Sequence, residues 1–189
     1  MKKILFISIL VILVITANAQ QKGTLRYGWD AGVALPRGGG GISGSGDIRY
    51  NIEYNWNIGL RYGAAFMIKP ITNIDIRQPA TDIYLVNDSY HIISDYYFNG
   101  TSSFAPFVGG GVGVYNFSYF LLNTTEATLG SCTHFGALLH IGFEWEGFRV
   151  GLEYNLIPST RLINAGGDVV GSSFNNYTNL TFGYYYTLW

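Results

Sequence analysis

The sequence predicts an all-β protein, an eight-stranded antiparallel up-and-down transmembrane β-barrel. Three observations lead to this prediction. Apolar and polar residues alternate with a period of two along most of the chain. Most alternating segments are longer than the roughly five or six residues of ordinary strands and match the ~9 to 11 residues that cross a bilayer at a tilt. The connections are alternately short and long, as in bacterial outer-membrane barrels.

The first four strands are predicted from the alternation itself. In residues 25–35, large apolar residues alternate with Arg, Gly, Asp and Ala. Residues 47–54 alternate isoleucine and tyrosine with charged residues and Asn. Residues 58–66 set apolar residues against Gly, Arg and Ala, and residues 90–98 show the weakest alternation.

The last four strands follow the same rule. Residues 105–116 set valines against glycines and Phe107. Residues 134–145 set aromatic and aliphatic residues against His, Gly and Glu. Residues 148–155 oppose Phe, Val, Leu and Tyr to Arg, Gly, Glu and Asn, and residues 180–188 end the chain with apolar residues at alternate positions.

The connections sort into two groups. Short links are predicted at residues 55–57, 99–103 and 146–147, and long loops at residues 36–46, 69–89, 117–131 and 158–176. Outer-membrane barrels have short turns on the periplasmic side and long loops outside the cell. The pattern therefore predicts that both termini of the barrel are periplasmic.

Charged residues within the predicted strands all fall on the polar face, and none falls on the apolar face. They are Arg26, Asp30, Arg49, Glu53, Arg61, Asp95, Glu144, Arg149 and Glu153. An Arg or Lys facing lipid would cost ~2 to 4 kcal/mol at mid-membrane. These side chains and His140 are therefore predicted to form a structural polar network in the lumen.

The tight turn at residues 146–147 predicts specific pairs in this network. A two-residue hairpin sets Glu144 opposite Arg149 and His140 opposite Glu153, all pointing inward. An eight-stranded barrel is narrow enough for side chains to fill, and buried charges need partners. The expected lumen is polar and largely plugged.

A soluble exported β-barrel or sandwich that binds a ligand is the alternative, because alternation alone does not say which face is inside. The long strands and the unequal loops count against it. So do aromatic residues at strand ends, such as Trp56, Tyr96, Phe98 and Trp145, which suit the girdle at a membrane interface.

The N-terminus has the pattern of a secretory signal peptide, with Lys2 and Lys3, an apolar run at residues 4–15, and the Ala17-Asn-Ala19 site. We expect residues 1–19 to be cleaved and residues 20–189 to form the barrel domain. The mature chain would then carry nine basic and twelve acidic residues, a net charge of −3 that does not favour nucleic acid. One cysteine leaves no internal disulfide, and no mature segment is apolar enough for a transmembrane helix.

The glycine clusters and the histidines are candidates for ligand binding or catalysis. The glycines at 109–113 are not followed by a helix pattern, so they are expected to make room in a narrow barrel, and residues 38–41 are read as a flexible loop. His134 and His140 are about 20 Å apart along one strand and cannot share a metal. Ser131 and His134 near one strand end leave open a lipid-modifying enzyme, but the sequence places no acid beside them. No metal, cofactor or catalytic residue is predicted.

The chain resembles the small outer-membrane β-barrel proteins of Gram-negative bacteria, of the OmpA/OmpX/OmpW-like kind and the Bacteroidetes type. The resemblance spans the mature chain and is carried by residues 94–98 leading into 105–115, and by residues 180–189. It implies that the assembly machinery recognises the C-terminal aromatic, Trp189. Here Trp189 is out of phase with Leu188, Tyr186 and Tyr184, unlike much of the family.

We therefore expect a non-enzymatic integral outer-membrane barrel with a structural or surface-interaction role, in contact with lipid and with the barrel-assembly machinery. An extracellular protein could bind by strand addition at the 69–89 loop, whose flanks at residues 71–77 and 82–86 are expected to extend the barrel as a hairpin. A small porin-like solute channel is the second hypothesis.

Overall fold

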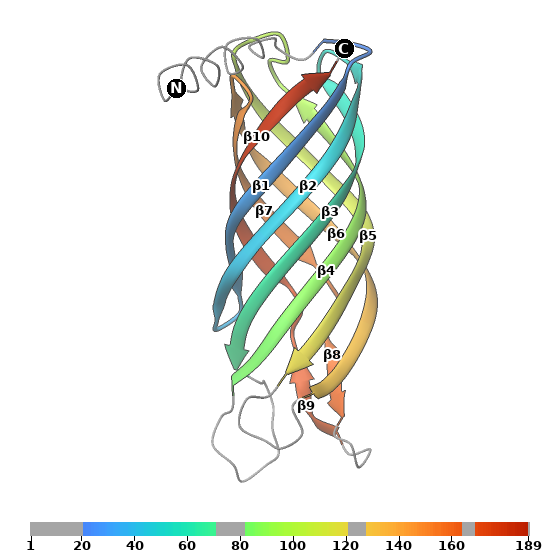
Figure 1. Cartoon of the computed structure of the whole chain (residues 1–189), viewed down its shortest axis with the longest axis vertical. Coiled ribbons are helices and arrows are strands. Elements are labelled where there is room, and N and C mark those ends of the chain that lie inside the picture. Colours follow the sequence, from blue (N-terminus) through green and yellow to red (C-terminus); the bar gives the residue numbers. More distant parts are fainter. Residues whose placement is uncertain (1–20, 71–81, 121–127, 164–168, 189) are drawn as a thin grey trace, which may run out of the picture.

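The computed structural model describes residues 21–70, 82–120, 128–163 and 169–188. Eight long strands close into one tilted barrel, and a separate hairpin of two short strands lies at one end (Figure 1). The barrel strands are β1 (Leu25–Pro36), β2 (Gly40–Glu53), β3 (Trp56–Pro70), β4 (Asp82–Tyr97), β5 (Phe104–Phe120), β6 (Thr128–Trp145), β7 (Phe148–Leu156) and β10 (Tyr177–Leu188). The hairpin is formed by β8 (Thr160–Ile163) and β9 (Val169–Ser173).

Each barrel strand pairs antiparallel with its neighbours, and β1 pairs with β10 to close the barrel. The predicted fold class is thus confirmed. Leu25 lies opposite Leu188, so the first strand begins and the last one ends at the same end of the barrel. Within the described ranges no helix is long and apolar enough to cross a membrane.

The short turns lie at the end that holds Leu25 and Leu188. The turn at Glu146 and Gly147 has φ values of 52° and 87°, as a two-residue hairpin of type I′ requires. Trp145 lies opposite Phe148, which is the predicted register. The local sequence alone set this part of the fold.

The opposite end differs from the prediction, because the strands run further than their alternation indicates. The loop expected at residues 36–46 is wrong: only residues 37–39 separate β1 from β2. The Gly- and Ser-rich start of β2 lacks large apolar residues, but it forms ladders with both β1 and β3. Pairing on both sides outweighs the low strand propensity of Gly and Ser.

The other long loops are also shorter than expected. Pairing of β3 with β4 continues to Pro70 opposite Asp82, which confirms that residues 82–86 extend the strand. The predicted flank at residues 71–77 lies outside the described residues. Likewise β5 and β6 pair as far as Phe120 and Thr128. The loop expected at residues 158–176 contains the β8–β9 hairpin, which the alternation did not predict.

The outer surface of the barrel is apolar over its whole circumference. Outward side chains such as Ile42 and Phe135 are each 68% exposed. Inward charged side chains such as Arg49 are fully buried. Soluble monomers rarely expose a contiguous apolar patch larger than several hundred Å². The surface therefore suits hydrocarbon, and the soluble-barrel alternative does not fit it.

The outer face of β4 carries a charged residue. Asp88 of β4 lies on the outer face opposite Ala64 and Asn116, and accepts a hydrogen bond from the Tyr62 hydroxyl at 2.8 Å. Asp88 lies outside the predicted strands, because β4 begins before the predicted residue 90. Thr133 beside Asn116 donates to its side chain at 2.9 Å. Asp88, Asn116 and Thr133 therefore form a polar row on the outer face of β4, β5 and β6.

Candidate functional site

Buried charges fill the lumen near the short turns, and we call this group the ionic layer. It consists of Arg26, Asp47, Arg49, Asp95, His140, Glu144 and Arg149, together with the ring residues Tyr97, Phe107 and Tyr185. Each of these side chains is at most 7% exposed. The layer combines residues from β1, β2, β4, β5, β6, β7 and β10.

Arg49 stands at the centre of the ionic layer. Its Nε and Nη2 atoms donate to the two oxygens of Asp47 at 3.1 and 2.8 Å, a bidentate pair, and its Nη1 donates to Asp95. The Tyr185 hydroxyl donates to Asp47 Oδ2 at 2.6 Å. Bidentate guanidinium–carboxylate pairs are strong and fix the orientation of the guanidinium. Arg49 Nη2 also donates to the Tyr185 hydroxyl at 3.0 Å, so Arg49 links β2 to β10 through Tyr185 and to β4 through Asp95.

Asp95 gathers three cations or donors from other strands. It accepts from Arg49, from Arg149 Nη2 at 2.9 Å, and contacts His140 Nε2. Arg149 also lies 3.7 Å above the centre of the Phe107 ring, a cation–π contact. Each buried charge here has partners, as burial in a low-dielectric lumen demands.

A second ion pair completes the layer at the rim. Arg26 donates through Nη2 to Glu144 Oε1, and the Tyr97 hydroxyl donates to Glu144 Oε2 at 3.0 Å. The predicted register of Glu144 opposite Arg149 is confirmed. The expected ion pair between them is replaced by pairs that reach across the lumen to β1 and β4, because the lumen is narrow and the Arg side chain is long.

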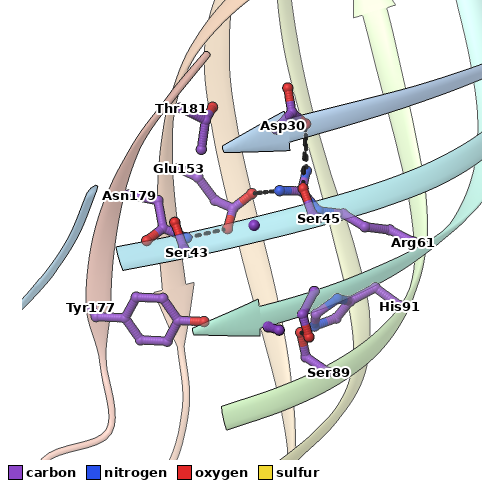
Figure 2. Close-up of a pocket in the computed structure, with 13 residues that line it drawn as sticks. Asp30, Ser43, Ser45, Arg61, Ser89, His91, Glu153, Tyr177, Asn179 and Thr181 are labelled. Atoms are coloured by element: carbon purple, nitrogen blue, oxygen red, sulfur yellow. Dashed lines mark hydrogen bonds and ion pairs between the residues drawn. The ribbon is translucent and has the colours of Figure 1, made fainter. Parts of the chain in front are cut away.

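The middle of the lumen holds a polar chamber, a cavity shown in Figure 2. Arg61 Nη2 pairs with Glu153 Oε2 at 2.8 Å, and Arg61 Nη1 lies 3.9 Å from Asp30 Oδ2. His140 is opposite Glu153 in register, as predicted, but Glu153 pairs with Arg61 and His140 contacts Asp95. The chamber is lined by Asp30, Ser43, Gly44, Ser45, Arg61, Gly63, Ala64, Ser89, His91, Glu153, Tyr177, Asn179 and Thr181.

Beyond the chamber, toward the long loops, the lumen is filled by apolar and aromatic side chains. We call them the apolar layer: Ala34, Ala65, Met67, Ile83, Leu85, Tyr115, Phe117, Tyr119, Ile157 and Tyr177. All are at most 5% exposed. A polar lumen was expected, so this layer is a correction. Four of its residues come from segments that were predicted as loops: Ile83, Leu85, Phe117 and Tyr119.

The connection between β7 and β10 is tied over the mouth of the barrel. Lys69 Nζ donates to the carbonyl of Phe174, and the Arg37 guanidinium lies 5.3 Å from the centre of the Phe174 ring. Asn176 Oδ1 accepts from the backbone N–H of Ile157 at 2.7 Å. Lys69 is the next-to-last residue of β3, and its side chain is buried. The ties hold the segment against the apolar layer.

A polar cluster sits beside this segment. His134 Nε2 lies 2.6 Å from Thr160 Oγ1 and 3.3 Å from Cys132 Sγ. Ser131 is on the opposite, outer face of β6, so the Ser131–His134 pair considered from the sequence is not formed. Residues three apart on a strand point to opposite sides, so their closeness in the sequence does not bring their side chains together.

Nine of the ten predicted lumen residues are buried inside the barrel. The exception is Glu53, whose side chain is 53% exposed and pairs with Lys22 at 2.5 Å outside the lumen. This pairing raises the pKa of Lys22. Asp47, which was left out of the predicted network, occupies the lumen instead, although its place on the polar face of residues 47–54 was visible. Trp189 lies outside the described residues.

Glycines leave space for the ionic layer, as the 109–113 cluster predicted. A Cβ atom on Gly109 would collide with Asp95 Oδ1 and His140 Nε2, and one on Gly28 would lie 2.5 Å from the Tyr185 ring. The strand carries its smallest residue where a large side chain from another strand crosses. The residues at 40 and 41, expected to be part of a flexible loop, lie in β2.

The described residues hold no group of three or more His, Cys, Asp or Glu side chains that could bind a metal ion. The chemistry that they do support is neutralisation of buried charge. No residue of the ionic layer or the chamber is arranged as a nucleophile beside a general base, and the one thiol–imidazole contact lies at the mouth.

Comparison with known proteins finds similar solved structures. No model of a protein family matches the sequence, and no curated protein matches it. Among solved structures, the chain is similar to Neisserial surface protein A, with 16% identity, a TM-score of 0.54, and coverage of 88% of this chain and 98% of that one. It is also similar to the outer membrane protein OprG from Pseudomonas aeruginosa, with 14% identity, a TM-score of 0.55, and coverage of 89% and 98%. The chain therefore has the fold of the small eight-stranded outer-membrane β-barrels.

Proposed function

We propose that this protein is a non-conducting outer-membrane barrel with a structural or surface-interaction role. The observation that carries the proposal is the filling of the lumen by two layers in series. Arg49 and Asp95 in the ionic layer are at most 1% exposed, and Met67 and Leu85 in the apolar layer are fully buried. A permeating solute would have to displace paired charges and packed apolar side chains in turn.

Planar-bilayer recording tests this proposal directly. Protein refolded from denaturant and inserted at known copy number should give no steady conductance above the bare membrane, whereas an open porin inserted in parallel should conduct. A sizeable, steady conductance from the native chain would replace the sealed-barrel proposal with that of a small solute channel.

A surface-interaction role is supported by the strands that continue past the polar row. The hairpin of β3 and β4 is flanked by β2 as far as Ile68 and by β5 as far as Tyr84, so most of its edge is covered. In β6, pairing with β7 begins only at Ala137, and residues 128–136 pair with β5 alone. We call this edge of β6 the uncovered edge because no described strand pairs with it on its second side, although Thr160 of β8 contacts the Cys132 and His134 side chains. It is better suited to strand addition than the described part of the β3–β4 hairpin.

Cell attachment tests the surface-interaction role. Cells that display the barrel should attach to protein-coated surfaces more than cells without it, and proline at Ser131, which lies on the uncovered edge, should abolish the difference. A matched control places proline at Ser102, in the short turn at the other end of the barrel. Equal attachment by all four strains would leave the structural role alone.

We propose an outer-membrane location with both termini periplasmic, a cleaved signal peptide at residues 1–19, and assembly that depends on Trp189. The paired ends of β1 and β10 support termini on one side. Membrane fractionation should recover a heat-modifiable band whose N-terminal residue is Gln20, and deletion of Trp189 should reduce its yield. Recovery of the chain in the soluble periplasm would contradict the proposal.

We propose that the barrel has no catalytic role. Incubation with lipid A or phospholipid should release no acyl chain. Acyl release that disappears in both Cys132→Ala and His134→Ala would overturn this proposal in favour of a lipid-modifying enzyme, with the thiol and imidazole at the mouth as the reacting pair.

A further inference from the structure

The polar chamber is a cavity between the ionic layer and the apolar layer. Along β1 the order is Arg26, Asp30 and Ala34, one residue for each region from the short turns toward the mouth. The volume open to the centre of a water molecule is about 10 Å³. A cavity of that size has room for roughly one water molecule.

One wall of the chamber is saturated with contacts. Glu153 accepts from Arg61 at 2.8 Å and from the side-chain N–H of Asn179 at 3.0 Å (Figure 2). It also accepts from the side-chain N–H of Asn155 at 2.9 Å. The Asn87 side chain donates to the Tyr177 hydroxyl at 2.9 Å. These contacts fix the walls, so the cavity has a defined shape.

Four lining side chains carry buried polar atoms with no hydrogen-bond partner among the described residues. The atoms are both ring nitrogens of His91, the hydroxyl of Ser43, Oδ1 of Asn179 and Oδ1 of Asp30. His91 and Asn179 are each 4% exposed. The His91 ring is held edge-on against Tyr115, with ring centroids 4.6 Å apart. Buried polar groups without partners destabilise a fold, so each needs an explanation.

The chemistry of these atoms selects the ligand. A neutral imidazole has one N–H donor and one acceptor nitrogen in either tautomer, and Asn179 Oδ1 only accepts. The ligand must therefore both donate and accept hydrogen bonds. A cation would meet the Arg61 guanidinium, and an anion would meet the carboxylates of Asp30 and Glu153. A single water molecule meets all these conditions and fits the volume.

We propose that the polar chamber binds one water molecule, held by His91, Ser43 and Asn179, as a permanent part of the polar lumen. The ionic layer and the apolar layer isolate it from both ends, so it exchanges with bulk water only when a layer opens. The water site does not depend on any surface interaction, and it is a separate claim from the absence of conductance.

The variant His91→Leu tests the proposal, because the urea midpoint should change in opposite directions for a hydrated and a dry chamber. If water occupies the chamber, the substitution removes one of its hydrogen bonds, and the equilibrium constant for folding in urea should fall about tenfold. If the chamber is dry, the substitution removes two unsatisfied polar atoms, and the urea midpoint should rise. Ser43→Ala should show the same sign with a smaller change. A rise in midpoint for both variants would overturn the proposal.

The bound water can also be detected directly, in an experiment that does not depend on how His91→Leu changes packing and the urea midpoint. Oxygen-17 relaxation dispersion on the refolded barrel counts water molecules that exchange slowly, and His91→Leu should lose one of them. His134→Leu, at the mouth and outside the chamber, should lose none from this site. An equal count in wild type and His91→Leu would overturn the proposal.

The salt used for unfolding separates water from a bound cation. Urea midpoints in sodium chloride and in choline chloride at equal ionic strength should agree, since water binding needs neither ion. A sodium-specific rise in the midpoint that disappears in Ser43→Ala would replace the water with a small monovalent cation.

Discussion

The ionic layer and the apolar layer close the same lumen by opposite means. In the first, Arg49 is fully buried and is held by the carboxylates of Asp47 and Asp95 from different strands. In the second, Met67 and Leu85 are equally buried and belong to a cluster of packed apolar side chains. The stability of the ionic layer depends on the partners of its buried charges, whereas the stability of the apolar layer depends on the absence of internal cavities. The two layers should therefore respond differently to single substitutions.

The largest effect is expected from removing the central charge of the ionic layer. Arg49→Met leaves Asp47 and Asp95 without their guanidinium, and should lower the free energy of unfolding by about 3 to 5 kcal/mol. Urea unfolding in lipid vesicles, followed by gel mobility, measures it. The control is Lys22→Met, which breaks an exposed ion pair at the rim and should leave the midpoint almost unchanged. Similar losses in both variants would mean that the ionic layer is not buried.

A somewhat smaller effect is expected in the apolar layer. Leu85→Ala removes a fully buried side chain and leaves a cavity, which should cost about 3 kcal/mol in the same assay. Leu60→Ala is the matched control, because Leu60 is 67% exposed on the outer face and no internal cavity forms there. If the two leucines cost the same, the apolar layer is not packed as the structure shows.

Added volume in the ionic layer should cost less than a lost charge. Gly109→Ala places a Cβ atom against Asp95, His140 and the Ser94 carbonyl, the last at 2.7 Å, and should destabilise by about 1 to 3 kcal/mol. In Gly44→Ala, the control, the nearest atom is 3.7 Å away and no penalty is expected. Equal midpoints for both alanine variants would show that the ionic layer shifts freely.

The smallest effect is expected at the wall of the polar chamber. Thr181 donates its hydroxyl to the Gly151 carbonyl at 3.3 Å, a long hydrogen bond. Thr181→Val keeps the shape and removes that bond, so the loss should be about 0.5 to 1.5 kcal/mol. A loss as large as that of Arg49→Met would mean that the chamber wall, and not the ion pairs, holds the middle of the barrel.

The ionic layer could be predicted from sequence much better than the apolar layer. Arg26, Arg49 and Arg149 lie on the polar face of strongly alternating segments, so their direction follows from the period of two. Met67, Ile83 and Phe117 lie where the alternation fades, and their strands are defined by pairing with neighbours. Backbone pairing across strands leaves no periodic signal in a single strand.

Partner identity was beyond the sequence even where residue direction was predictable. Glu144 and Arg149 are opposite each other as expected, yet Glu144 binds Arg26 and Arg149 binds Asp95. Inside a narrow lumen a long side chain reaches strands that are not its neighbours in the sheet. Glu53 also has a partner that the sequence did not predict. It lies on the polar face, but at the end of β2, where its side chain is exposed at the rim and pairs with Lys22.

The sequence by itself sorted the strand side chains onto two opposite faces, because successive residues of a strand point to opposite sides. The unequal loops and the aromatic strand ends then favoured lipid on the apolar face. The sequence also determined the tight turn at Glu146 and Gly147 and the register that follows from it. Only the tertiary structure decided which charges meet, where the apolar layer begins, and that a polar chamber lies between. Those features depend on distances across a closed barrel, and such distances exist only after the eight strands have closed around one lumen.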